Sequence, residues 1–158
     1  MADENKDAVA QRTYDALCEY CDGKGYSYDK NENEDEKWIN ISFTDDEGNN
    51  LRFVFTVDFS RNLIRVLNFL PISVEEDKKT DFAVGINEIN EKLRIGWFDF
   101  GYEQGNITYN LCNSFSQSML GEEFFEYLFE YSLNVNGYFL DRFIGLNSGM
   151  FSLEDWLD

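Results

Sequence analysis

Histidine is absent from this sequence of 158 residues, and proline, cysteine and basic residues are scarce. Without an imidazole, the chain lacks the commonest general base, which excludes the Ser–His and Cys–His types of hydrolase. The G-x-S-x-G motif, the P-loop and the G-x-G-x-x-G motif are missing as well. We therefore expect no catalytic, cofactor-binding or metal-binding residues, and a protein that is not an enzyme.

Basic residues are outnumbered by acidic ones, 13 against 31, which gives a net charge of −18. A field of that sign repels phosphate backbones and anionic lipid surfaces, so we expect neither nucleic acid nor a membrane as a partner. Basic proteins or divalent cations would be attracted instead. The same charge also keeps an aromatic-rich protein in solution, and composition alone leaves both interpretations open.

Long apolar runs are missing too, since no stretch approaches the ~20 residues that span a bilayer. The first residues lack the basic segment followed by an apolar segment that marks a secretory signal. The three cysteines fit a reducing compartment, so we expect a cytoplasmic location. Cys18 and Cys21 form a CxxC late in a predicted helix, beside Glu19 and Asp22. Acidic neighbours disfavour thiolates and no histidine is available for zinc, so we expect free, structural thiols.

Pro71 is the one proline, and no linker-like segment divides the chain. Hydrophobic residues make up 43% and aromatic residues 17% of the sequence, enough for a packed core. The sequence predicts one domain over residues 1–158, with its core at about 8–157.

Residues 80–113 are the most informative stretch, because hydrophobic periodicity there changes from helical to alternating. Phe82, Ile86 and Ile89 recur on one helix face, and Asp81 is a candidate N-cap. Strands at 97–100 and 106–111 then flank a polar turn that contains Gly105. This pattern predicts a helix followed directly by a β-hairpin.

The remaining segments predict an α+β fold with the order α-β-β-β-α-β-β-α. A helix is expected at 8–20, an antiparallel meander of strands at 38–43, 51–58 and 63–69, and a helix at 120–146. The segment 134–137, with two asparagines and Gly137, could kink or split that last helix. A capping box at Ser152 and Asp155 precedes a final turn. All five strands can form one antiparallel sheet with the helices mainly on one face.

The acidic segment 29–36 lacks apolar residues and predicts a solvated loop. Asp29, Asn31 and Asn33 have the 1-3-5 spacing of a calcium-binding EF-hand loop. Position six is Glu34 instead of glycine, and position twelve is Asn40 instead of glutamate. Because the bend and the bidentate ligand are both missing, we predict no calcium site.

Several features together resemble a known family: the strand 66–70 ending at Pro71, the helical segment 86–90, Trp97-Phe98-Asp99, the strand 105–111 and the long aromatic last helix. This is the YbjN family, whose fold is that of the type III secretion chaperones. The resemblance covers roughly residues 8–157. It implies an α+β fold that often forms homodimers, a role in binding other polypeptides, and no catalytic residues.

The last predicted helix carries more aromatic residues than one buried face requires. A helix that is apolar on most sides is buried from both sides or covered by a partner, and an unusually aromatic core is the alternative. The candidate partner-binding residues are Phe125, Tyr127, Phe129, Tyr138, Phe139 and Phe143.

The leading prediction is a non-catalytic, chaperone-like module that binds a basic or partly unfolded protein. Binding would use the apolar helix face or an exposed sheet edge. Two alternatives stay open. One is an acidic decoy of nucleic acid that occupies a basic protein groove. The other is a small-ligand or divalent-metal-dependent enzyme that uses clustered carboxylates.

Overall fold

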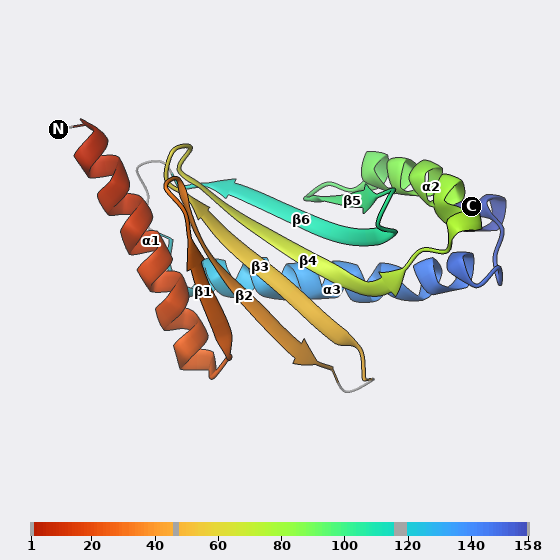
Figure 1. The fold of residues 1–158 in the computed structure, drawn as a ribbon, viewed down its shortest axis with the longest axis horizontal. Helices are drawn as coiled ribbons and strands as arrows, with labels where there is room; N and C mark the ends of the chain where they lie inside the picture. The colour runs from red at the N-terminus through yellow and green to blue at the C-terminus, as the bar shows by residue number, and fades with distance from the viewer. Residues whose placement is uncertain (1, 46–47, 116–119, 158) are drawn as a thin grey trace.

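The computed structural model describes residues 2–45, 48–115 and 120–157, which form one antiparallel sheet and four α-helices (Figure 1). The strands lie in the order β1-β2-β3-β4-β6-β5. The expected α+β class is confirmed, but the sheet has six strands instead of five. In chain order the elements are α1 (Ala2–Lys24), β1 (Tyr28–Glu32), β2 (Glu36–Thr44), β3 (Asn50–Asp58), β4 (Leu63–Ser73), the 3-10 turn η1 (Glu76–Lys78), α2 (Lys79–Lys92), β5 (Trp97–Gly101), β6 (Asn106–Ser114), α3 (Glu122–Asn147) and α4 (Leu153–Leu157).

The additional strand is β1, which lies where the sequence predicted a solvated loop. It pairs with β2 in register from Tyr28↔Ile41 to Glu32↔Lys37. Asn33 then closes the turn, because its Oδ1 accepts hydrogen bonds from the backbone N–H groups of Asp35 and Glu36. The prediction was wrong because an edge strand is held by backbone pairing on one side and needs no apolar alternation. Charged residues suit such an edge.

The meander β2-β3-β4 and the hairpin β5-β6 form as predicted, and β4 pairs with β6 to join them. Asp45 and Asn49 close the β2–β3 turn, whereas Asp46 and Glu47 lie outside the described residues. Pro71 lies inside β4, not at its end. The register between β4 and β6 shifts between Phe69 and Ser73, and a proline is tolerated at such an irregularity.

The helices cover one face of the sheet, as expected, and the buried apolar residues form one cluster beneath them. Figure 1 shows α3 running behind the strands, while no helix lies in front of β3 and β4. At one end, Phe129 of α3 packs against Phe53 of β3 with the rings tilted and their centroids 4.6 Å apart. At the other end, Phe143 contacts Phe98 of β5 and Phe82 of α2.

The helix boundaries differ in detail from those predicted. α1 begins at Ala2, before the expected residue 8, and α2 begins at Lys79, which places Asp81 inside the first turn and not at the cap. The predicted capping box of α4 is confirmed: the Ser152 hydroxyl donates to Asp155 over 2.6 Å and accepts from its backbone N–H over 3.1 Å.

α3 is one continuous helix through residues 134–137, which settles whether the last helix is one or two. Asn136 is buried and its amide Nδ2 donates to the backbone oxygen of Asn68 on β4 over 3.5 Å. The packing of this turn against the sheet outweighs the weak helix propensity of asparagine and glycine.

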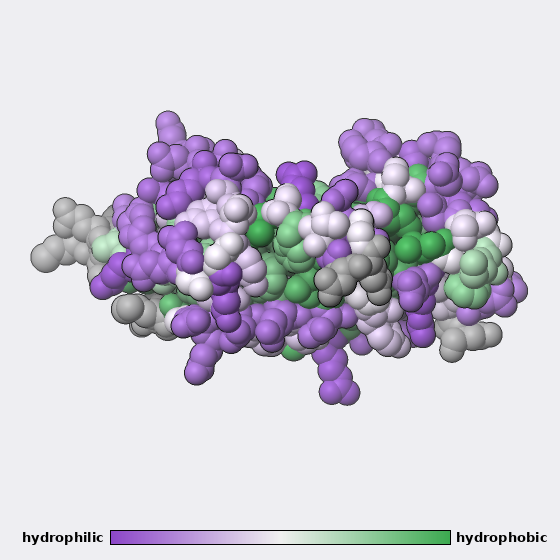
Figure 2. Space-filling view, turned by 90° about the horizontal axis from the view of Figure 1, so that it is seen from below, coloured by the Kyte–Doolittle hydropathy of each residue, from purple (hydrophilic) through white to green (hydrophobic). Residues whose placement is uncertain are grey.

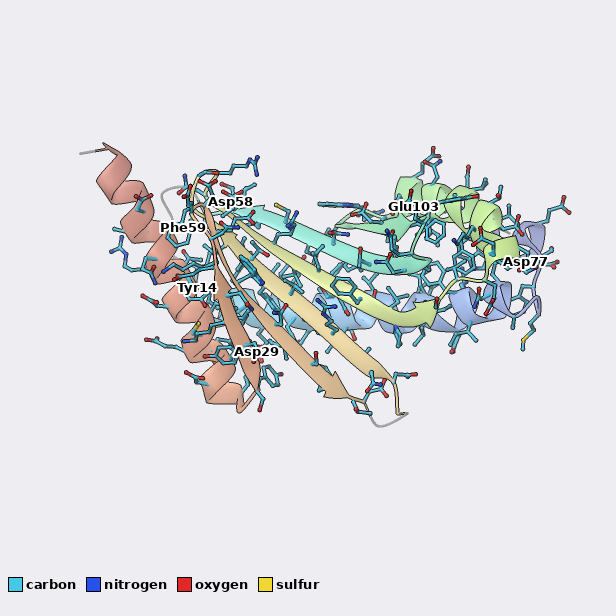
Figure 3. All side chains as sticks on the ribbon, in the orientation of Figure 1. Tyr14, Asp29, Asp58, Phe59, Asp77 and Glu103 are labelled. Carbon is cyan, nitrogen blue, oxygen red and sulfur yellow. The ribbon has the colours of Figure 1, made fainter. Side chains whose placement is uncertain are left out.

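One buried cation ties α2 to the β5–β6 turn. The Lys79 ammonium lies 2.6 Å from the Glu76 carboxylate and donates to the backbone oxygen of Glu103 over 3.1 Å. Figure 3 shows Glu103 beside α2. No helix in the described part of the chain is long and apolar enough to cross a lipid bilayer.

Candidate partner-binding surface

Three of the six candidate partner-binding residues lie in the core. Phe125, Phe129 and Phe143 are each 4% exposed or less. Phe125 contacts Tyr20 of α1, while the other two pack on the sheet as described above. Because a buried side chain cannot touch a partner of the folded monomer, the candidate set must be corrected to exclude these three.

Of the other three candidates, Tyr127 and Tyr138 lie on a different side of α3. Tyr127 and Tyr138 are exposed, Tyr138 by 65%, and Phe139 is half-buried. Tyr127 and Tyr138, together with the half-buried Phe124 and Tyr131, recur at spacings of three, four and seven residues, so these four side chains share one side of the helix. Phe139 instead packs against the core rings of Phe98 and Phe143. We call the row of Phe124, Tyr127, Tyr131 and Tyr138 the aromatic flank.

Contacts between rings organise the aromatic flank. Ring centroids lie 5.5 Å apart in the pair Tyr127–Tyr131 and 4.9 Å apart in the pair Tyr138–Phe139. Tyr131 also approaches Tyr109 of β6, whose hydroxyl donates to the backbone oxygen of Ile95 over 2.6 Å. The α2–β5 connection therefore borders the flank, and the exposed side chain of Ile95 adds to the apolar surface of that connection.

The opposite side of α3 borders a cavity of about 370 Å³ beneath the β2–β3 turn. Leu133, Gly137 and Leu140 of α3 line it on one side. Figure 2 views the molecule from below, the side toward which that turn projects in Figure 1, and shows apolar (green) residues between hydrophilic (purple) ones. The sequence analysis missed this cavity, because its walls come from segments far apart in the chain.

The sheet edge at β5 is closed to a further strand. The Asn90 side chain of α2 donates from Nδ2 to the backbone oxygen of Phe98 and accepts from its N–H at Oδ1, both over 2.8 Å. These are the two bonds that a neighbouring strand would make. The other edge, β1, presents Asp29, Lys30 and Glu32, and charged residues discourage strand addition. The geometry favours the helix face over a sheet edge.

The uncovered sheet face carries a mixed surface that the sequence analysis also missed. Arg52 lies over the ring of Phe69, 4.6 Å from its centroid, and Trp97 is exposed near Arg65 and Cys112. The Asn110 amide donates to Asp99 over 2.9 Å on the same face. Apolar and charged groups lie beside one another at these positions of the face.

The three cysteines are free, and Cys18 and Cys21 are buried. Burial, followed by the neighbouring Cys18 and Asp22, raises the pKa of Cys21 to about 12. Cys112 is exposed on β6, and partial burial raises its pKa as well. Within residues 2–45, 48–115 and 120–157, no group of three or more Cys, Asp or Glu side chains could hold a metal ion. Asp29 and Asn31, considered above for calcium, lie on strand β1.

No protein-family model matches this sequence, and no curated protein is similar enough to it to count as a relative.

Proposed function

We propose that this protein is a non-catalytic, chaperone-like module that binds a polypeptide partner through the aromatic flank of α3. The observation that carries the proposal is the exposure of aromatic rings along a helix whose core face is already filled. Phe125, Phe129 and Phe143 complete the core, so the rings of Tyr127 and Tyr138 are surplus to it. Exposed tyrosines in a row supply large amphipathic contact area at low cost in side-chain entropy.

The charge of the protein selects among partners. With a net charge of −18, it attracts basic polypeptides and repels acidic ones during diffusional encounter. Glu122 and Glu123, in the first turn of α3, lie next to the aromatic flank in sequence. A basic or partly unfolded protein is therefore the proposed client. A homodimer and the resemblance to the YbjN family both stay predictions.

The test measures whether the protein suppresses aggregation of a basic, unfolded client, for which we choose reduced lysozyme. The variant Tyr127→Ser/Tyr138→Ser should raise the chaperone concentration for half-suppression by about tenfold, as the loss of two aromatic contacts implies. Tyr102→Ser is the matched control, because Tyr102 is as exposed but lies in the β5–β6 turn. Equal activity of the double variant and the control would contradict the proposal.

The −18 charge also favours a second candidate, an acidic decoy that occupies the nucleic-acid groove of a basic protein. The two candidate functions differ in how client binding depends on salt. Decoy binding is carried by exposed charges and should fall steeply as ionic strength rises, whereas contact through the aromatic flank should survive moderate salt. Client binding that disappears at moderate salt and is unchanged by the double tyrosine variant would favour the decoy.

A further inference from the structure

The cavity beside α3 has the dimensions and lining of a site for one large apolar side chain. Its volume, about 370 Å³, lies in the range of ligand pockets. Apolar side chains from three strands and the helix form its walls: Phe43, Leu51, Leu70, Pro71, Leu133 and Leu140. An apolar group that enters the cavity is therefore removed from water, which is favourable.

One polar group in the wall has no partner. Asn136 is only 3% exposed and lines the cavity, and within the described residues its Oδ1 accepts no hydrogen bond. The orientation of this amide follows from its other end, because Nδ2 donates to the backbone oxygen of Asn68. This oxygen is closed to solvent as well, so it faces the protein interior and leaves recognition of an occupant to the apolar walls and the bordering charges.

Carboxylates stand at the mouth of the cavity. Asp141 of α3 and Asp45 of the β2–β3 turn both border it, and the Asp45 carboxylate is held in place by the backbone and amide N–H groups of Asn49. Glu130, two helical turns before Gly137, lies on the same side of α3. Negative charge at the mouth disfavours a fatty acid or a phosphate and favours a cation.

We propose that this cavity is the anchor pocket for the polypeptide client and receives a leucine- or phenylalanine-sized side chain that is flanked by lysine or arginine. The flanking cations lie against the carboxylates of Asp141 and Asp45, which border the cavity. The proposal rests on the proposed function, since it names the part of the client that binds. Gly137 and Tyr138 are consecutive, so a segment that crosses α3 can reach both the cavity and the aromatic flank.

Gly137 provides a variant that fills the cavity without disturbing the core. A Cβ at this position would have no heavy atom within 4 Å, so Gly137→Leu has room for its side chain at the cavity wall. Leucine is also the better helix former, and we expect the melting temperature to rise by about 2–4 °C. Weaker client binding by a more stable protein could not be attributed to unfolding.

The probe is a blocked pentapeptide, glycine–lysine–leucine–lysine–glycine, titrated into the labelled full chain and followed by NMR, which detects weak binding. We expect shifts at the Asn136 side-chain amide and at the Gly137 N–H. Affinity should drop about tenfold or more when alanine replaces the leucine, when glutamates replace the lysines, or in Gly137→Leu. Tyr138→Ser should leave pentapeptide binding within about twofold, because its ring lies on the other side of α3.

The two proposals fail in different ways. If Gly137→Leu suppresses lysozyme aggregation as well as the unchanged protein does, the anchor pocket is wrong while the proposed function stands. Loss of suppression only in the double tyrosine variant has the same meaning. Absence of peptide shifts, or equal binding of the glutamate peptide, also overturns the anchor pocket. Larger shifts with decanoate than with the lysine peptide would assign the cavity to a lipid chain and overturn it as well.

Discussion

The side chain of Asn90 takes the place of a missing strand at the β5 edge, and we predict that this role dominates its effect on stability. Both of its hydrogen bonds reach the backbone of Phe98, at 2.8 Å each, and the Phe98 side chain is buried between β6 and α3. Asn90→Ala removes both partners at once. The backbone N–H and C=O of Phe98 then lose the groups that satisfy them.

The expected cost follows from those two bonds. A buried backbone group left without a partner costs about 1–3 kcal/mol, and an edge position admits some water, which lowers the cost. Because alanine has a higher helix propensity than asparagine, the substitution regains roughly half a kcal/mol of stability. We therefore expect Asn90→Ala to reduce the free energy of unfolding by about 2–4 kcal/mol, a large part of the ~5–15 kcal/mol of a typical domain.

Urea unfolding followed by circular dichroism measures the change, and Asn87→Ala is the matched control. Asn87 lies on the exposed side of the same helix, so its replacement brings the same propensity gain and removes no bond to β5. Asn90→Asp should be intermediate, because it keeps the acceptor for the Phe98 N–H and loses the donor. If Asn90→Ala and Asn87→Ala differ by less than about 0.5 kcal/mol, the strand-replacement role of Asn90 is refuted.

Two further predictions concern titratable groups. Burial alone would raise the pKa of Asp58, but hydrogen bonds from the Arg61 backbone N–H, the Ser60 hydroxyl and the Arg61 guanidinium together hold it below its ordinary value (Figure 3 shows Asp58). This stabilisation is complete above the unfolded pKa of about 4 and is lost as pH falls through the lower folded pKa, so the difference in unfolding free energy between wild type and Asp58→Asn should shrink below about pH 4. A difference in unfolding free energy that stays constant down to about pH 2 would contradict this prediction. For the thiols, burial and the raised pKa of Cys21 predict that Ellman's reagent modifies Cys112 alone in the folded protein and all three cysteines in denaturant. Rapid modification of three thiols without denaturant would show that α1 is not packed as described.

The aromatic surplus of α3 could be predicted from the sequence, but its division into core and surface could not. Phe125, Tyr127 and Phe129 lie at every second position, so they do not all share one side of the helix. Helical periodicity alone does not say which side meets the sheet. Only the direction in which α3 crosses β3 and β4 places Phe129 against Phe53 and leaves Tyr127 and Tyr138 outside. The sequence therefore predicted the aromatic surplus of α3 but not which of its members are exposed.

The cavity lay beyond sequence reasoning altogether. Its walls join Phe43, Leu51 and Pro71 to Leu133 and Leu140, which are separated by more than sixty residues of chain. From the sequence alone, each of these residues is interpreted as an ordinary core residue, and Asn136 as an interruption of the helix. The cavity exists because the β2–β3 turn and α3 diverge without filling the space between them.

By itself the sequence determined the α+β class, the meander, the helix–hairpin unit at 80–113 and the capping box, because these depend on local periodicity, turn residues and short connections. The tertiary structure decided what depends on partners distant in the chain. It made residues 28–32 a strand through backbone bonds to β2, and it kept α3 continuous by burying Asn136. It also closed the β5 edge with Asn90, because a side-chain amide can complete a backbone ladder only where packing brings α2 to that edge.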